Sequence, residues 1–143
     1  MTAFTNYLEN QVLAHIFRTA TFTKPTTLYV GLITTTPTTT DTGTGETGTV
    51  TEASGGSYAR VAVAPLDANW TAATGNNGTT SNVAAVTFPA CTADWGTVNA
   101  FGIWDASTAG NLLVYSALTT PRTITAGSTP SFGAGALTVQ VDN

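Results

Sequence analysis

Residues 93–118 read ADWGTVNAFGIWDASTAGNLLVYSAL and decide the fold of this chain. They hold two of its three tryptophans and its densest run of β-branched, aromatic and leucine side chains. From residue 97 to residue 105 the side chains alternate, but both faces are apolar, with Val98, Ala100 and Trp104 on one face and Phe101 and Ile103 on the other. A strand that is apolar on both faces is typical of the centre of a sheet that is covered on both sides.

A second strand follows after a short turn. Residues 106–110 are rich in turn formers, and residues 111–118 return with Leu112, Val114 and Leu118 on one face and Leu113 and Tyr115 on the other. Gly102 in the first strand predicts a bulge or a close approach of another backbone. We therefore predict a central antiparallel hairpin.

Further short strands surround this hairpin on both sides in sequence. Their residues are rich in β-formers or alternate, and Gly, Pro and Asn turns separate them: 27–33, 57–64, 82–88, 121–125 and 136–141. This pattern favours a mainly β fold, an antiparallel β-sandwich or Greek-key barrel with one N-terminal α-helix. Residues 1–143 are expected to form a single β domain, with a long exposed Thr/Gly-rich loop at about 34–56.

One helix is predicted at residues 6–17. Asn6 and Glu9 have the spacing of a capping box, with Asn6 as the N-cap. Apolar residues recur at helical spacing along a broad stripe: Leu8, Val12, Leu13, Ile16 and Phe17. A helix of this length is marginal in isolation, so it must dock on its own sheet or on a neighbouring subunit. We regard Leu8, Val12, Ile16 and Phe17 as the candidate partner interface.

The charge composition excludes several classes of partner. Charged residues make up 8% of the chain, against about 25% in an average protein. Four scattered cations are too few to neutralise many phosphates, so we expect no nucleic-acid partner. We also expect no membrane partner and no signal peptide, because no long apolar run and no basic N-terminal region are present. The single cysteine, Cys91, is expected to be buried.

The sequence carries no recognisable catalytic, cofactor-binding or metal-binding motif. A single histidine, His15, within an apolar helix cannot complete a serine-hydrolase triad or a zinc site, so we assign it a packing or hydrogen-bonding role. Asp94 and Asp105 are interpreted as turn residues that bind backbone amides, and Arg60 as a partner in a structural salt bridge. The protein is therefore not expected to be an enzyme or to use a cofactor.

Five segments together resemble a family of small tailed-bacteriophage virion structural proteins. These are NYLENQVLAHIF and TKPTTLYVGLITTTP near the N-terminus, SGGSYAR at 54–60, VTFPACTADWGTVNAFGIWDASTAGNLL at 86–113 and ALTTPRTITAG at 117–127. The order of the segments is kept over nearly the whole chain, although the threonine-rich loop at 34–53 is longer than in the family. Members of this family are labelled tail-fibre-like, and similar cyanophage proteins are capsid cement proteins.

The resemblance implies a structural protein without catalysis. Our leading hypothesis is a capsid cement (decoration) protein, made in the host cytoplasm, that binds the major capsid protein on the outer capsid surface as a homo-oligomer, a trimer. The alternative is a tail or tail-fibre component that contacts host-surface glycans through Trp70, Trp95 or Trp104.

Overall fold

The computed structural model describes residues 2–35, 50–73 and 78–141 of the chain. Within them it contains one helix and nine strands: β1 (Thr2–Phe4), α1 (Asn6–Phe17), β2 (Leu28–Ile33), β3 (Val61–Val63), β4 (Thr79–Ser81), β5 (Val86–Thr87), β6 (Gly96–Trp104), β7 (Leu112–Ile124), β8 (Ser131–Phe132) and β9 (Thr138–Gln140). The predicted fold class, mainly β with one N-terminal helix, is confirmed.

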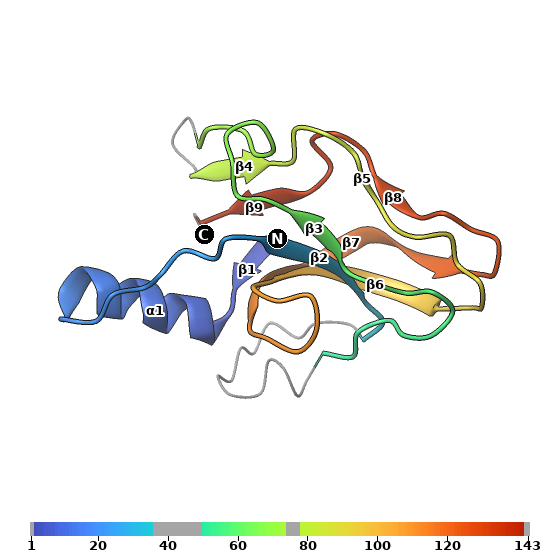
Figure 1. Ribbon diagram of the computed structural model, residues 1–143, viewed down its shortest axis with the longest axis horizontal. Coiled ribbons are helices and arrows are strands. Elements are labelled where there is room, and N and C mark those ends of the chain that lie inside the picture. The colour runs from blue at the N-terminus through green and yellow to red at the C-terminus, as the bar shows by residue number, and fades with distance from the viewer. Residues whose placement is uncertain (1, 36–49, 74–77, 142–143) are drawn as a thin grey trace.

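The strands form one large sheet and two small ribbons. Five strands pair antiparallel in the order β1-β7-β6-β2-β3, while β4 pairs with β9 and β5 with β8. The two ribbons lie together over one face of the large sheet, so the body has two layers (Figure 1). The large sheet does not close on itself, so of the two predicted architectures the layered one is observed and the barrel is not.

The central hairpin is confirmed. Strand β6 is in the middle of the large sheet, between β7 and β2. The turn is closed by Asp105, whose Oδ1 accepts from the Asn111 backbone N–H at 2.7 Å and whose Oδ2 accepts from Asn111 Nδ2 at 2.7 Å. Asp94 likewise binds a backbone amide, that of Ala126 at 2.8 Å. Both aspartates therefore have the predicted role, although the amide bound by Asp94 is distant in sequence.

Two irregularities in the pairing of β6 with β7 overturn part of the predicted face assignment. The register shifts between Val98 and Ala100, and again between Ile103 and Trp104, where Leu113 is the extra residue. An extra residue reverses the alternation beyond it. Val98 therefore lies in the same core as Phe101 and Ile103, and Leu112 packs with Trp104 instead of Val114.

Gly102 is not in a bulge; it makes room for Trp104. A Cβ on Gly102 would lie 2.7 Å from atoms of the Trp104 ring and from Leu112 Cδ1, and one on the paired Gly31 would lie 2.7 Å from the same ring. The predicted close approach at Gly102 is therefore made by a side chain, not by a backbone.

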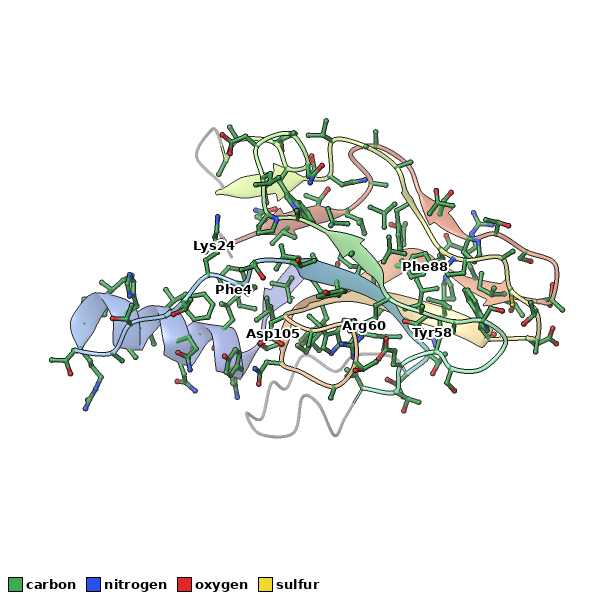
Figure 2. All side chains as sticks on the ribbon, viewed as in Figure 1. Phe4, Lys24, Tyr58, Arg60, Phe88 and Asp105 are labelled. Carbon is green, nitrogen blue, oxygen red and sulfur yellow. The ribbon has the colours of Figure 1, made fainter. Side chains whose placement is uncertain are left out.

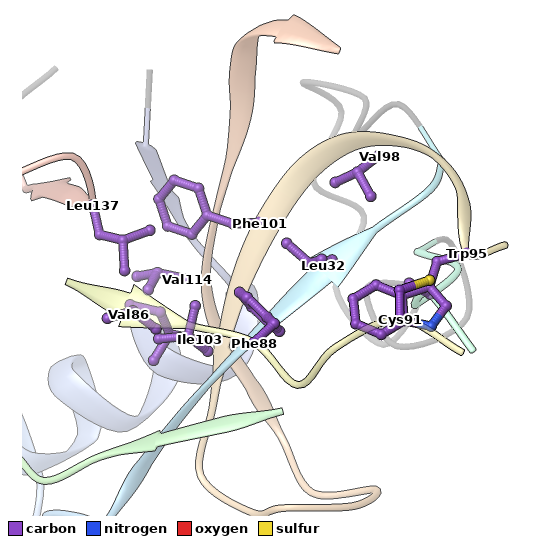
Figure 3. Packing of buried hydrophobic residues seen from close by; sticks show 12 residues of the cluster. Leu32, Val86, Phe88, Cys91, Trp95, Val98, Phe101, Ile103, Val114 and Leu137 are labelled. Carbon is purple, nitrogen blue, oxygen red and sulfur yellow. The ribbon is translucent and has the colours of Figure 1, made fainter. Parts of the chain in front are cut away.

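Apolar side chains form a core on each face of the large sheet. The larger core lies between the sheet and the two ribbons and contains the residues labelled in Figure 3: Leu32, Val86, Phe88, Cys91, Trp95, Val98, Phe101, Ile103, Val114 and Leu137. The smaller core, on the opposite face, contains Ile33, Ala100, Trp104, Leu112 and Tyr115. Cys91 is buried as predicted.

Three predicted strands are shorter than expected, and three observed strands were not predicted. The strand predicted at 57–64 is regular only at β3, because Ser57 has a positive φ of 67° and lies in a turn. The strand predicted at 82–88 is reduced to β5, and the one predicted at 136–141 to β9. The strands that were not predicted, β1, β4 and β8, have two or three residues each, too few to show a periodicity.

The C-terminal end of the Thr/Gly-rich segment is not a solvated loop. Ala53 is buried, its N–H donates to Leu32 O at 2.8 Å, and the Thr34 N–H donates to Thr51 O at 2.8 Å. The prediction of an exposed loop at 34–56 is therefore wrong at Ala53, and residues 51–53 extend the edge of the sheet beside β2. Residues 36–49 lie outside the described part of the chain.

We predict that Gly102→Ala lowers the free energy of unfolding by about 1–3 kcal/mol, because the new methyl group overlaps the Trp104 ring. Gly133→Ala is the matched control, since a Cβ there meets no atom within 4 Å, and it should change stability by less than about 0.5 kcal/mol. Urea denaturation measures both. Equal stability of the two variants would contradict the packing described here.

Candidate partner-binding surface

A polar cluster around Arg60 lies beside the central hairpin (Figure 2). Arg60 forms a two-pronged ion pair with Glu52, with Nη2 2.7 Å from Oε2 and Nε 2.8 Å from Oε1. Its Nη1 donates to the carbonyls of Ala106 and Ala109 at 2.7 and 2.8 Å, and its guanidinium lies 4.0 Å from the centre of the Trp104 ring. The predicted structural salt bridge is confirmed. Because these contacts engage all three nitrogens of the guanidinium, the cluster holds this part of the fold together.

Tyr58 completes this cluster. Its hydroxyl donates to Glu52 Oε1 at 2.8 Å and accepts from the Leu32 backbone N–H at 2.8 Å. Burial, together with the negative charge of Glu52, raises the pKa of Tyr58 far above its usual value, so the phenol is neutral at physiological pH. Tyr58 therefore satisfies an amide of β2 in place of a neighbouring strand.

The described residues bring no catalytic or metal-binding constellation together. No group of three or more His, Cys, Asp or Glu side chains that could hold a metal ion occurs among them. His15 Nδ1 accepts a hydrogen bond from the Phe22 N–H at 3.3 Å, which fits its predicted hydrogen-bonding role. No helix in the described ranges is both long and apolar enough to cross a membrane.

The helix is anchored at its first residue by a buried threonine. Thr5, not Asn6, is the N-cap: its Oγ1 accepts from the Leu8 N–H at 3.3 Å and donates to the carbonyl of Leu112 at 2.6 Å. The Thr5 N–H also donates to the carbonyl of Leu113 at 3.0 Å. The cap therefore ties the start of α1 to the start of β7. The predicted capping box assigned this role one residue too late.

The rest of α1 projects away from the two-layered body (Figure 1). All of α1 is in the described part of the chain, and none of its residues is buried. Leu13, Ile16 and Phe17 expose 54%, 63% and 76% of their surface. The sequence left two alternatives for this helix, docking on its own sheet or on a neighbouring subunit. Beyond the first turn of α1, docking on its own sheet is excluded.

The chain returns from the end of α1 to the body as an extended segment. Lys24 Nζ donates to Pro65 O at 3.4 Å, close to the point where β2 begins. Figure 2 places Lys24 and Phe4 at the base of the projection. We refer to residues 6–27, the helix and its return segment, as the arm.

The candidate interface residues separate into two groups along the arm. Leu8 packs against the larger core, and Val12 is half-buried, whereas Ile16 and Phe17 are exposed at the far end. The structure therefore places these four side chains at different distances from the body and not in one patch. Leu13, which was not among the candidates, is exposed beside Ile16 and Phe17.

An apolar cavity of about 640 Å³ lies at the base of the arm. Its walls come from segments far apart in sequence: Phe4, Leu8, Leu28, Pro65, Leu66, Asp67, Trp70, Thr71, Ala72, Ala73, Thr80, Ile103, Leu113, Val114 and Val139. Trp70 Nε1 is buried and has no hydrogen-bond partner among the described residues. Sequence reasoning missed this cavity, because no local pattern brings these segments together.

The tryptophans do not form the glycan-binding set suggested by the sequence. Trp95 and Trp104 are buried, and Trp95 Nε1 donates to the carbonyl of Gly56 at 3.0 Å. Only Trp70 is partly exposed, and it lines the cavity. A contact between glycans and Trp95 or Trp104 is therefore excluded.

A known protein family matches this chain over nearly its whole length. The family model described as Podophage GP4 fiber I protein gp80 matches residues 3–140, nearly the whole chain. No curated protein matches the chain. The match includes the arm, strands β2 to β9, β1 except its first residue, and every residue that lines the cavity.

We predict that stability falls at alkaline pH through Tyr58. Because its pKa is raised in the folded protein, the folded state holds this proton more tightly than the unfolded state. The resulting stabilisation is complete below about pH 10 and is lost above it. The free energy of unfolding then falls by at most about 1.4 kcal/mol per pH unit. Tyr58→Phe should be less stable at pH 8, by about 1–3 kcal/mol, because the Leu32 N–H loses its acceptor.

Urea denaturation of both proteins between pH 8 and 11.5 measures this effect. The stability difference between them should narrow above about pH 10, because only the parent can lose the Tyr58 proton. Parallel pH profiles would show that Tyr58 ionises equally easily in both states.

Proposed function

Because the chain belongs to the family described as Podophage GP4 fiber I protein gp80, we propose that it is a structural component of a fibre on the virion of a short-tailed bacteriophage. The match over nearly the whole chain is the observation that carries this proposal. A structural role in the phage virion holds for the family as a whole, and the fibre is the finer assignment that we propose.

The geometry supports a protein that works by assembly and without catalysis. The body is held by two apolar cores and by the Arg60 cluster, and of the arm only Leu8 packs against the larger core. The arm exposes large apolar side chains, and a contiguous apolar surface on a soluble protein is typical of a contact site. With a net charge of −4 and only four cations, attachment must depend mainly on apolar contacts, because exposed ion pairs contribute only about 0–1 kcal/mol each.

A capsid cement protein is the second candidate. It is favoured by the short elements of the described chain, where the only helix has 12 residues and the longest strand has 13. A fibre shaft normally needs long helices or repeated strands, and a lattice-binding protein does not. In this role the protein would bind the outer surface of the major capsid protein lattice as a trimer.

We predict that a cryo-EM reconstruction of the virion, without imposed icosahedral symmetry, places this protein at the tail. Quantitative mass spectrometry of purified virions should then give a few to dozens of copies per particle. Hundreds of copies spread over the capsid would establish the cement role in place of the fibre. Absence of the protein from purified virions would contradict both candidates.

A further inference from the structure

We propose that the far end of α1 of one copy fills the apolar cavity at the base of the arm of a second copy. The interface joins two different surfaces, the arm end with Ile16 and Phe17 and the cavity beside Leu66 and Trp70. The inference rests on the proposal that the protein acts in a multi-copy assembly. It does not depend on whether that assembly is part of the tail or of the capsid.

The arm needs a partner that its own chain does not provide. An isolated helix of 12 residues is marginal in water, and helices in proteins gain most of their stability from packing of an apolar face. None of the residues of α1 is buried, and its exposed large apolar side chains all lie in its last five residues. A partner that covers this end supplies the missing packing.

The cavity of the same copy cannot accept this end of the helix. Leu8 lines the cavity, and Phe17 follows nine residues later on the same straight helix, which places its backbone about 14 Å further along the axis. The cap at Thr5 holds the start of the helix, and the contact of Lys24 with Pro65 holds the return segment, next to the cavity. The arm therefore points away from its own cavity, and an arm end that fills this cavity must come from another copy.

The polar groups of the two surfaces are complementary. Among the described residues that line the cavity, Asp67 carries the only charge, and it is negative. The end of α1 carries His15 and Arg18 and no acidic residue after Glu9. The last turn of a helix leaves carbonyl oxygens without partners inside the helix, and Trp70 Nε1 is a buried donor without an acceptor. A small apolar molecule in the cavity would neither neutralise the charge of Asp67 nor accept a hydrogen bond from Trp70 Nε1.

An interface of this kind determines the type of assembly. Each copy gives one arm and receives one, which is a head-to-tail contact that forms a ring when the rotation closes. A ring of three copies would bury three arm ends in three cavities. Each subunit would then be held at two places, which strengthens the assembly beyond a single contact.

The test uses purified full-length protein and three variants. Phe17→Asp inactivates the arm end, and Ala72→Trp fills the cavity with a bulky side chain. Val83→Asp is the matched control, because Val83 is an exposed apolar residue that belongs to neither surface. Thermal melting and circular dichroism establish that each variant keeps the β body. Size-exclusion chromatography with light scattering, over a range of protein concentrations, gives the mass of each assembly.

We expect a closed oligomer for the parent and for Val83→Asp, and at least tenfold weaker assembly for Phe17→Asp and for Ala72→Trp. An equimolar mixture of the two weak variants should form a two-subunit complex, because one copy retains its cavity and the other retains its arm. Several results would overturn the proposal: a monomeric parent at several hundred micromolar, an Ala72→Trp variant that assembles like the parent, or a mixture that does not complement. An Ala72→Trp variant that assembles like the parent would be the result if a small molecule or another virion protein occupied the cavity.

Discussion

The body of this protein depends on the position of the Trp104 ring. The ring lies against Gly31 and Gly102, which are paired across β2 and β6, and the guanidinium of Arg60 covers it at 4.0 Å from its centre. A cation over a desolvated tryptophan contributes about 2 kcal/mol, and the ring itself buries a large apolar area. Because Arg60 also binds Glu52 and the hairpin turn, this one stack joins the central strands to two loops.

A body stabilised in this way leaves the N-terminal helix free for another role. The arm is attached through Thr5, Leu8 and Lys24, all at its base, and no described contact fixes its far end to the body. A helix whose apolar end is exposed is costly for an isolated subunit and useful for an assembling one. This division between a self-sufficient body and an incomplete arm is what connects the fold to a structural role in a virion.

The sequence predicts those elements whose signal is local. The bounds of the helix and the presence of the central hairpin follow from apolar spacing and turn residues, and both are confirmed. The second strand of the hairpin is longer than predicted, because β7 continues to Ile124 and takes in the separate strand predicted at 121–125. The faces of the hairpin do not follow, because strict alternation cannot reveal the extra residue at Leu113 or the register shift after Val98. The direction of the helix and the cavity at its base could not be predicted either, since both depend on contacts between segments such as Leu8, Leu66 and Val139 that are distant in sequence.

The central claim is that α1 is completed by a neighbouring subunit and not by its own body. Hydrogen exchange of the α1 amides, in intact virions and in dilute purified protein, tests it most directly, with the amides of β6 as an internal reference. We expect slow exchange in β6 in both samples, and slow exchange in the second half of α1 only in virions, because an uncovered short helix opens frequently. Exchange in α1 of the dilute protein as slow as that in β6 would contradict the account.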